Sequence, residues 1–81
     1  MTELNRIFDL LDARPFVSFD VDMENGRRIH VSHPENVTIF PDRVRVREIL
    51  VYYPERDDYS IIFPRGITAL HVEARENSPE G

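Results

Sequence analysis

The sequence predicts a mainly β domain with one N-terminal helix, folded as a small, strongly bent antiparallel sheet or a partly open barrel of five to six strands. Three observations lead to this fold class. Apolar residues repeat with a helical period before Pro15 and with a period of two after it. The alternating segments are short and are separated by tight turns. The 81 residues suffice for one domain with a single core, which we expect over residues 1–74, with a polar tail at 75–81.

Composition narrows the classes of protein that the chain can belong to. It contains no cysteine, which excludes disulfides, thiolate metal sites and a cysteine nucleophile. No segment approaches the roughly 18 apolar residues of a membrane-spanning helix, so we expect a cytoplasmic protein. The net charge is −5, which disfavours non-specific binding to nucleic acid, although a local basic patch is compatible with it.

The N-terminal helix is predicted over residues 3–12. Its apolar positions lie on one face at helical spacing: Leu4, Ile7, Phe8 and Leu11. Pro15 ends the helix because it disfavours the α conformation at the residue before it. The apolar face is expected to pack against a sheet.

A β-hairpin is predicted next, around a three-residue loop of Glu24, Asn25 and Gly26. This loop pairs Val21 with Ile29 and so keeps the apolar residues of both strands on one face, whereas a two-residue loop would pair Val21 with a histidine. It also places Gly26 at the left-handed position that such loops need. The other pairs of this register are Phe19 with Val31, Asp20 with His30, and Asp22 with Arg28.

The second half of the chain is predicted to continue as antiparallel strands. After a turn at Pro41–Asp42, we expect Ile39 to pair with Val44 and Val37 with Val46. The alternation slips around Glu48, which indicates a β-bulge or a sharp bend. The next inward-facing set is expected to be Tyr59, Ile61 and Phe63. A turn at residues 64–66 precedes a last strand over residues 67–72.

A stripe of arginines is the most unusual feature. In the register above, Arg43, Arg45 and Arg47 share the outer face of one strand and have no carboxylate opposite them on the neighbouring strand. Tyr52, Tyr53 and Arg56 follow further along the chain. Arginine with tyrosine is typical of protein interface hot spots and of single-stranded nucleic-acid platforms. The alternative is a solvated strand face that discourages edge pairing.

The sequence lacks the patterns that carry catalysis or metal binding. We find no nucleophile elbow and no glycine-rich phosphate loop. His30 and His33 are three residues apart and therefore point to opposite faces of a strand, so they are not expected to share a metal. His71 is expected on an outer face beside Glu73. We therefore expect no enzymatic activity, no cofactor and no metal, and see no sign of a small-molecule substrate.

Three segments resemble a known pattern: Arg14–Phe19, Asn25–Arg27 and His30–Glu35. They are similar to a group of short bacterial proteins with an RPF-x-PF, GR and V-x-HP pattern, for which no activity is established. Here Ser18 replaces the second proline, and Asn25 replaces the usual aspartate before the glycine. The resemblance covers the first half of the chain and implies a shared fold and a bacterial origin, but no functional residue. A weaker similarity to Sm-like proteins, which are SH3-like barrels, lies in the order of helix, strand and Asn25-Gly26 turn.

Two functions follow as hypotheses. The first is a small protein-interaction or self-associating module without enzymatic activity. The second is an RNA- or DNA-binding regulator that uses an arginine–tyrosine surface of a Sm-like or SH3-like barrel. In both, the candidate partner-binding residues are Arg43, Arg45, Arg47, Tyr52, Tyr53 and Arg56.

Overall fold

The computed structural model describes residues 2–72 and contains one helix followed by six strands. The elements are α1 (Thr2–Asp12), β1 (Phe19–Met23), β2 (Arg28–Val31), β3 (Val37–Pro41), β4 (Val46–Tyr53), β5 (Asp58–Ile62) and β6 (Ile67–Val72), with 3₁₀ turns η1 (Pro34–Asn36) and η2 (Pro64–Gly66). The predicted helix and last strand are confirmed. Within residues 2–72 no helix has the length and apolar character needed to cross a membrane. The predicted tail at residues 75–81, and Glu73, lie outside the described residues.

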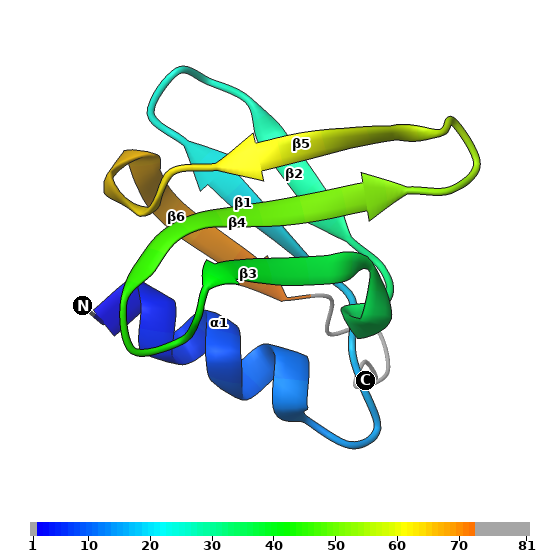
Figure 1. Cartoon of the computed structure of the whole chain (residues 1–81), viewed down its shortest axis with the longest axis horizontal. Helices are drawn as coiled ribbons and strands as arrows, with labels where there is room; N and C mark the ends of the chain where they lie inside the picture. The colour runs from blue at the N-terminus through cyan, green and yellow to red at the C-terminus, as the bar shows by residue number, and fades with distance from the viewer. Residues whose placement is uncertain (1, 73–81) are drawn as a thin grey trace, which may run out of the picture.

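The six strands form two antiparallel three-stranded sheets (Figure 1). Sheet A has the strand order β2-β1-β6, and sheet B has the order β3-β4-β5. The mainly β class with one helix is therefore confirmed, while the strands are divided between two sheets that do not close on each other. Sheet B lies in front of sheet A in Figure 1, and α1 runs along one side of the pair.

The core lies between the inner faces of the two sheets and the apolar face of α1. Its largest fully buried side chains are Phe19 on β1, Ile49 on β4 and Ile62 on β5. The helix contributes Ile7 and Leu11, as its helical spacing predicts. Each element thus buries one face, and the opposite faces of both sheets point outward.

The predicted register of the first hairpin is confirmed. Phe19 lies opposite Val31 and Val21 opposite Ile29. The loop of Glu24, Asn25 and Gly26 is closed by the Gly26 N–H, which donates to the Met23 carbonyl at 2.9 Å. Gly26 has φ of 89°, a backbone conformation that residues with a Cβ atom rarely adopt.

The predicted pairing of the next two strands is wrong. Ile39 lies opposite Ile49 and not Val44, because the connection is longer than a tight turn. Arg43, Val44 and Arg45 lie in this connection, and Val44 is 92% exposed. The Asp42 carboxylate accepts hydrogen bonds from the N–H groups of Val44 and Arg45, both at 2.9 Å, and so shapes the loop.

The predicted irregularity near Glu48 is confirmed. Phe40 lies opposite Glu48 and Pro41 opposite Val46, so the register shifts by one residue at Arg47. One strand therefore carries an extra residue, which is the definition of a bulge. Beyond it β4 continues regularly to Tyr53.

The predicted inward face of β5 is also wrong. Ile62 is 1% exposed and belongs to the core, whereas Ile61 is 40% exposed. Tyr59 and Phe63 are exposed as well. The β4–β5 connection explains the difference, because it pairs Tyr52 with Tyr59 and so places every second residue of β5 on the outer face of β4.

Two proline-led corners connect the sheets. η1 joins β2 of sheet A to β3 of sheet B, and η2 joins β5 of sheet B to β6 of sheet A. Each begins with a proline, Pro34 or Pro64, whose fixed φ suits the first position of a helical turn. In Figure 1 the two corners lie at opposite ends of the molecule.

Candidate interaction surface

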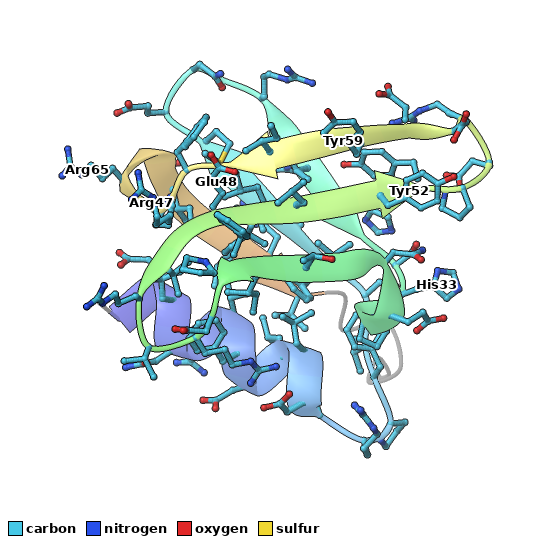
Figure 2. The ribbon with its side chains drawn as sticks, viewed as in Figure 1. His33, Arg47, Glu48, Tyr52, Tyr59 and Arg65 are labelled. Carbon is cyan, nitrogen blue, oxygen red and sulfur yellow. The ribbon has the colours of Figure 1, made fainter. Side chains whose placement is uncertain are left out.

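The outer face of sheet B carries aromatic and aliphatic side chains where a solvated face would carry polar ones. Side chains alternate along each strand, so β3, β4 and β5 each send every second residue to this face. Figure 2 views the molecule from this side, with Glu48, Tyr52 and Tyr59 labelled. We call this surface the aromatic face; it consists of Phe40, Glu48, Leu50, Tyr52, Tyr59 and Ile61, with Thr38 opposite Leu50 and Phe63 directly after β5.

Strand pairing makes the aromatic face continuous. Tyr52 lies opposite Tyr59, and Leu50 lies opposite Ile61. Phe40, Tyr59 and Phe63 are exposed by 54%, 57% and 56%. Since an aromatic side chain presents about 150–250 Å², the face offers on the order of 500 Å² of mostly apolar surface. This lies near the upper end of what a soluble monomer exposes in one patch.

One carboxylate lies among the apolar side chains of the aromatic face. Glu48 is on β4, directly opposite Phe40 and next to Leu50 on the same face. Its side chain is half-buried. Among residues 2–72 no hydrogen bond or ion pair joins the Glu48 carboxylate to another group. The aromatic face therefore contains one carboxylate, Glu48, that no group of the described residues pairs with.

The two ends of the aromatic face differ in charge. At the β4–β5 connection, the Tyr52 hydroxyl donates a hydrogen bond to the Asp57 carboxylate at 2.9 Å, which raises the pKa of Tyr52 above its ordinary value of 10.0. At the other end lie Arg47 and Arg65, both labelled in Figure 2, which line a pocket together with Phe63. One end is thus acidic and the other basic.

A groove of about 580 Å³ runs beside β5, between this strand and the β1–β2 hairpin. Met23 and Ile29 line it from sheet A, and Tyr59, Ile61 and Phe63 line it from the β5 side. β5 is an edge strand of sheet B, and β2 is an edge strand of sheet A. The aromatic face therefore continues over the edge of its sheet into a groove.

The structure separates the predicted arginines. The Arg43 guanidinium forms two hydrogen bonds with the Asp12 carboxylate, at 2.7 and 2.9 Å, and lies 5.0 Å from the centre of the Phe8 ring. The hydrogen bonds from Arg43 lower the pKa of Asp12. Arg45 is exposed in the same loop, and Arg47 is exposed on β4. The expectation that these three share one strand face without a carboxylate is wrong.

The predicted tyrosines point to opposite sides of β4. Tyr52 belongs to the aromatic face, whereas Tyr53 packs against the core, with its hydroxyl 3.2 Å from the Ser60 hydroxyl. The Arg56 guanidinium lies over the Tyr53 ring at 4.3 Å from its centre, which is a cation–π contact. Of the six candidate residues, Tyr52 lies on the aromatic face and Arg47 lies at its end. Partner binding by the six stays a prediction.

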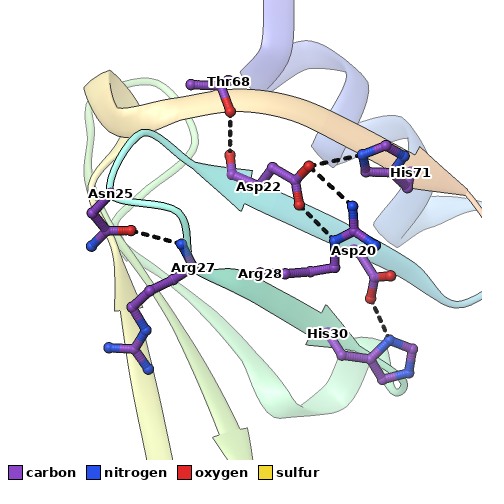
Figure 3. A network of polar contacts seen from close by, with 8 residues as sticks. All are labelled: Asp20, Asp22, Asn25, Arg27, Arg28, His30, Thr68 and His71. Carbon is purple, nitrogen blue, oxygen red and sulfur yellow. Dashed lines mark hydrogen bonds and ion pairs between the residues drawn. The ribbon is translucent and has the colours of Figure 1, made fainter.

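The outer face of sheet A is polar and internally paired (Figure 3). His30 Nδ1 lies 2.6 Å from the Asp20 carboxylate, as the predicted register requires. Asp22 pairs with the Arg28 guanidinium at 2.7 Å and with His71 Nε2 at 2.8 Å. The hydrogen bonds from Arg28 and then His71 lower the pKa of Asp22 to about 2. Within residues 2–72 no cluster of three or more potential metal ligands is present.

Sequence reasoning missed most of the aromatic face. Tyr59, Ile61 and Phe63 were expected inside, and Phe40 was not identified as a surface residue. The signal that could have found them is the four-residue connection from Pro54 to Asp57, because its length pairs Tyr52 with Tyr59.

Comparison with family models, with curated proteins and with solved structures gives no match for this chain.

Proposed function

We propose that this chain is a protein-interaction module without enzymatic activity and that the aromatic face is its binding surface. The observation that carries the proposal is the contiguous exposure of Phe40, Tyr52, Tyr59, Ile61 and Phe63 on one side of sheet B. A standard interface buries about 800 Å² on each partner, and the roughly 500 Å² of the aromatic face would supply more than half of it. Tyrosine in particular is enriched among residues that dominate binding energy.

The pairing of other ionisable groups supports a non-enzymatic role. Asp20 and Asp22 lie on an open sheet face and are held by histidine and arginine. A pKa of about 2 keeps Asp22 ionised at neutral pH, whereas a general acid or base works best with a pKa near the operating pH. These carboxylates act as cross-strand pairs that stabilise sheet A.

The strand order favours a partly open SH3-like or Sm-like barrel as the fold behind this module. We count β2 and β3 as one long strand that η1 interrupts. The order of neighbouring strands is then β6, β1, the combined strand β2–β3, β4 and β5. The opening of such a barrel is then between its outer strands, β5 and β6, which do not pair with each other. This fold hosts many unrelated functions, so the binding role depends on the surface and not on the fold.

A nucleic-acid partner is the second candidate, because four exposed aromatic side chains on one sheet could stack on bases. Electrostatics favours protein over nucleic acid. Glu48 lies within the face and Asp57 at its end, where both would repel phosphates. Arg43, one of the predicted partner-binding arginines, is paired with Asp12.

The proposal is tested with a double variant, Tyr59→Ser with Phe63→Ser, and a matched control, Val44→Ser, which changes an exposed residue away from the face. Each chain is immobilised and exposed to an extract of its source cells, and any retained protein is then purified and its Kd measured by calorimetry. A partner that binds the native chain and the control with equal Kd, and the double variant at least tenfold more weakly, supports the proposal. Equal binding by all three chains, or selective binding of a labelled single-stranded oligonucleotide through Tyr59 and Phe63, overturns it.

A further inference from the structure

We propose that the partner of the aromatic face is an apolar peptide segment that carries one arginine or lysine, and that this cation pairs with Glu48. The inference rests on the proposed function of the face and adds the chemistry of the partner. It starts from the contrast between Glu48 and the other carboxylates on the strands of the described chain.

Four carboxylates lie on strands within residues 2–72: Asp20, Asp22, Glu48 and Asp58. Asp20 and Asp22 pair with cross-strand or neighbouring side chains, and Asp58 accepts a hydrogen bond from the Tyr59 N–H at 2.7 Å. Glu48 has no such contact with the described residues, although it is half-buried among apolar side chains. The fold thus provides partners for its other strand carboxylates and leaves this one open.

Any partner that covers the aromatic face removes water from Glu48. A wholly apolar partner would leave the carboxylate desolvated and unpaired, which is strongly unfavourable. A guanidinium or ammonium group would replace the lost water with charge-assisted hydrogen bonds. The aliphatic part of an arginine or lysine side chain can at the same time pack on neighbours such as Phe40 and Leu50.

A second copy of the chain fits this requirement poorly. A two-fold interface brings residue i of one copy against residue j of the other, and only residues on the axis meet their own copies. Glu48 lies near one end of the face, beside Arg47, so an axis through the centre of the face would place it against the end of the other copy that carries Tyr52 and Asp57. Arg47 and Arg65 lie at the same end of the face as Glu48, so this axis would carry the arginines of the other copy away from Glu48. The net charge of −5 further favours the approach of a basic segment over that of another acidic chain.

The test uses a phage-displayed library of random 12-residue peptides, selected against the full native chain. We expect enriched peptides to share one arginine or lysine flanked by apolar residues. Synthetic copies of them should bind the Glu48→Gln variant at least tenfold more weakly than the native chain, as measured by fluorescence polarisation. Selection against Glu48→Lys should enrich acidic residues at the same position. Circular dichroism checks that each variant is folded, and Glu48→Gln preserves the shape of the side chain.

Tyr59→Ser separates failure of this inference from failure of the proposed function. Peptides that lose affinity for Tyr59→Ser but bind Glu48→Gln as tightly as the native chain would keep the face as a binding surface and overturn the role of Glu48. If no peptide is enriched, or if none of those enriched depends on Tyr59, both proposals are overturned. A native dimer in light scattering that Tyr59→Ser dissociates would assign the face to a second copy and also overturn the inference.

Discussion

Replacing Ile62 with alanine is expected to destabilise the protein far more than the same change at its neighbour Ile61. Ile62 is 1% exposed in the core, whereas Ile61 is 40% exposed on the aromatic face. The substitution removes three carbon groups, worth about 0.8 kcal/mol each when fully buried, and leaves a cavity. We therefore expect a loss of about 3–4 kcal/mol at Ile62, within the range measured for large-to-small core changes. At Ile61 no cavity forms, and the expected loss is about 1 kcal/mol.

Equilibrium urea unfolding followed by circular dichroism measures both losses. With a slope of about 1 kcal/mol/M, typical of small domains, the midpoints should fall by about 3 M for Ile62→Ala and about 1 M for Ile61→Ala. A domain of this size has a total stability of about 5–10 kcal/mol, so Ile62→Ala removes a large share of it. The milder Ile62→Val is therefore measured as well. That change should cost about 1 kcal/mol, and Ile61→Val less than half as much.

An equal loss at the two positions, or a larger one at Ile61, would refute the face assignment of β5. The result matters beyond stability, because the same assignment places Tyr59 and Phe63 on the surface. A reversed order would return these residues to the core and remove the aromatic face.

Three further predictions concern the turn and the polar contacts. Gly26→Ala should lower the free energy of unfolding by about 1 kcal/mol, measured by urea unfolding. Gly26 has φ of 89° and an added Cβ meets no atom within 4 Å, so the penalty comes from the backbone conformation alone. An unchanged midpoint would contradict this prediction. Stability should fall as the pH is lowered from 3.8 through about 2, because in this window the Asp22 carboxyl of the unfolded chain takes up a proton while the folded one, held by Arg28, does not. The thermal midpoint of Asp22→Asn should depend less on pH across that window, and an unaltered pH profile would argue against this pairing. Tyr53→Phe should cost about 1 kcal/mol in thermal unfolding through loss of its hydrogen bond to Ser60, and no loss would show that this bond is not stabilising.

The first hairpin was predictable because two independent signals agree. The alternation of Phe19 and Val21 with aspartates defines one buried face, and the loop ending at Gly26 sets the register. A shift of one residue would have turned the apolar set outward, so the alternatives were few. The same is true of α1, whose apolar face has one arrangement at helical spacing.

The second sheet was harder to predict because its segments are apolar on both faces. Ile49, Leu50 and Val51 are consecutive, as are Ile61 and Ile62, so a period of two does not identify the inward residue. The alternation of Val44 with arginines mimics a strand, although Val44 lies in a loop shaped by Asp42.

The candidate site was predicted only in part for the same reason. Tyr52 was identified, but its partners on the face come from β3 and β5, whose registers depend on the length of the connections. The contact of Arg43 with Asp12 joins residues 31 positions apart, and no local pattern indicates it.

The two proline-led corners have a mechanical consequence. Because η1 and η2 connect the sheets at opposite ends, a force that separates sheet A from sheet B is shared between both connections. Opening about a single hinge would stretch the distant corner, so each connection limits opening at the other. A domain joined in this way keeps the spacing of its layers when a force acts on one of them.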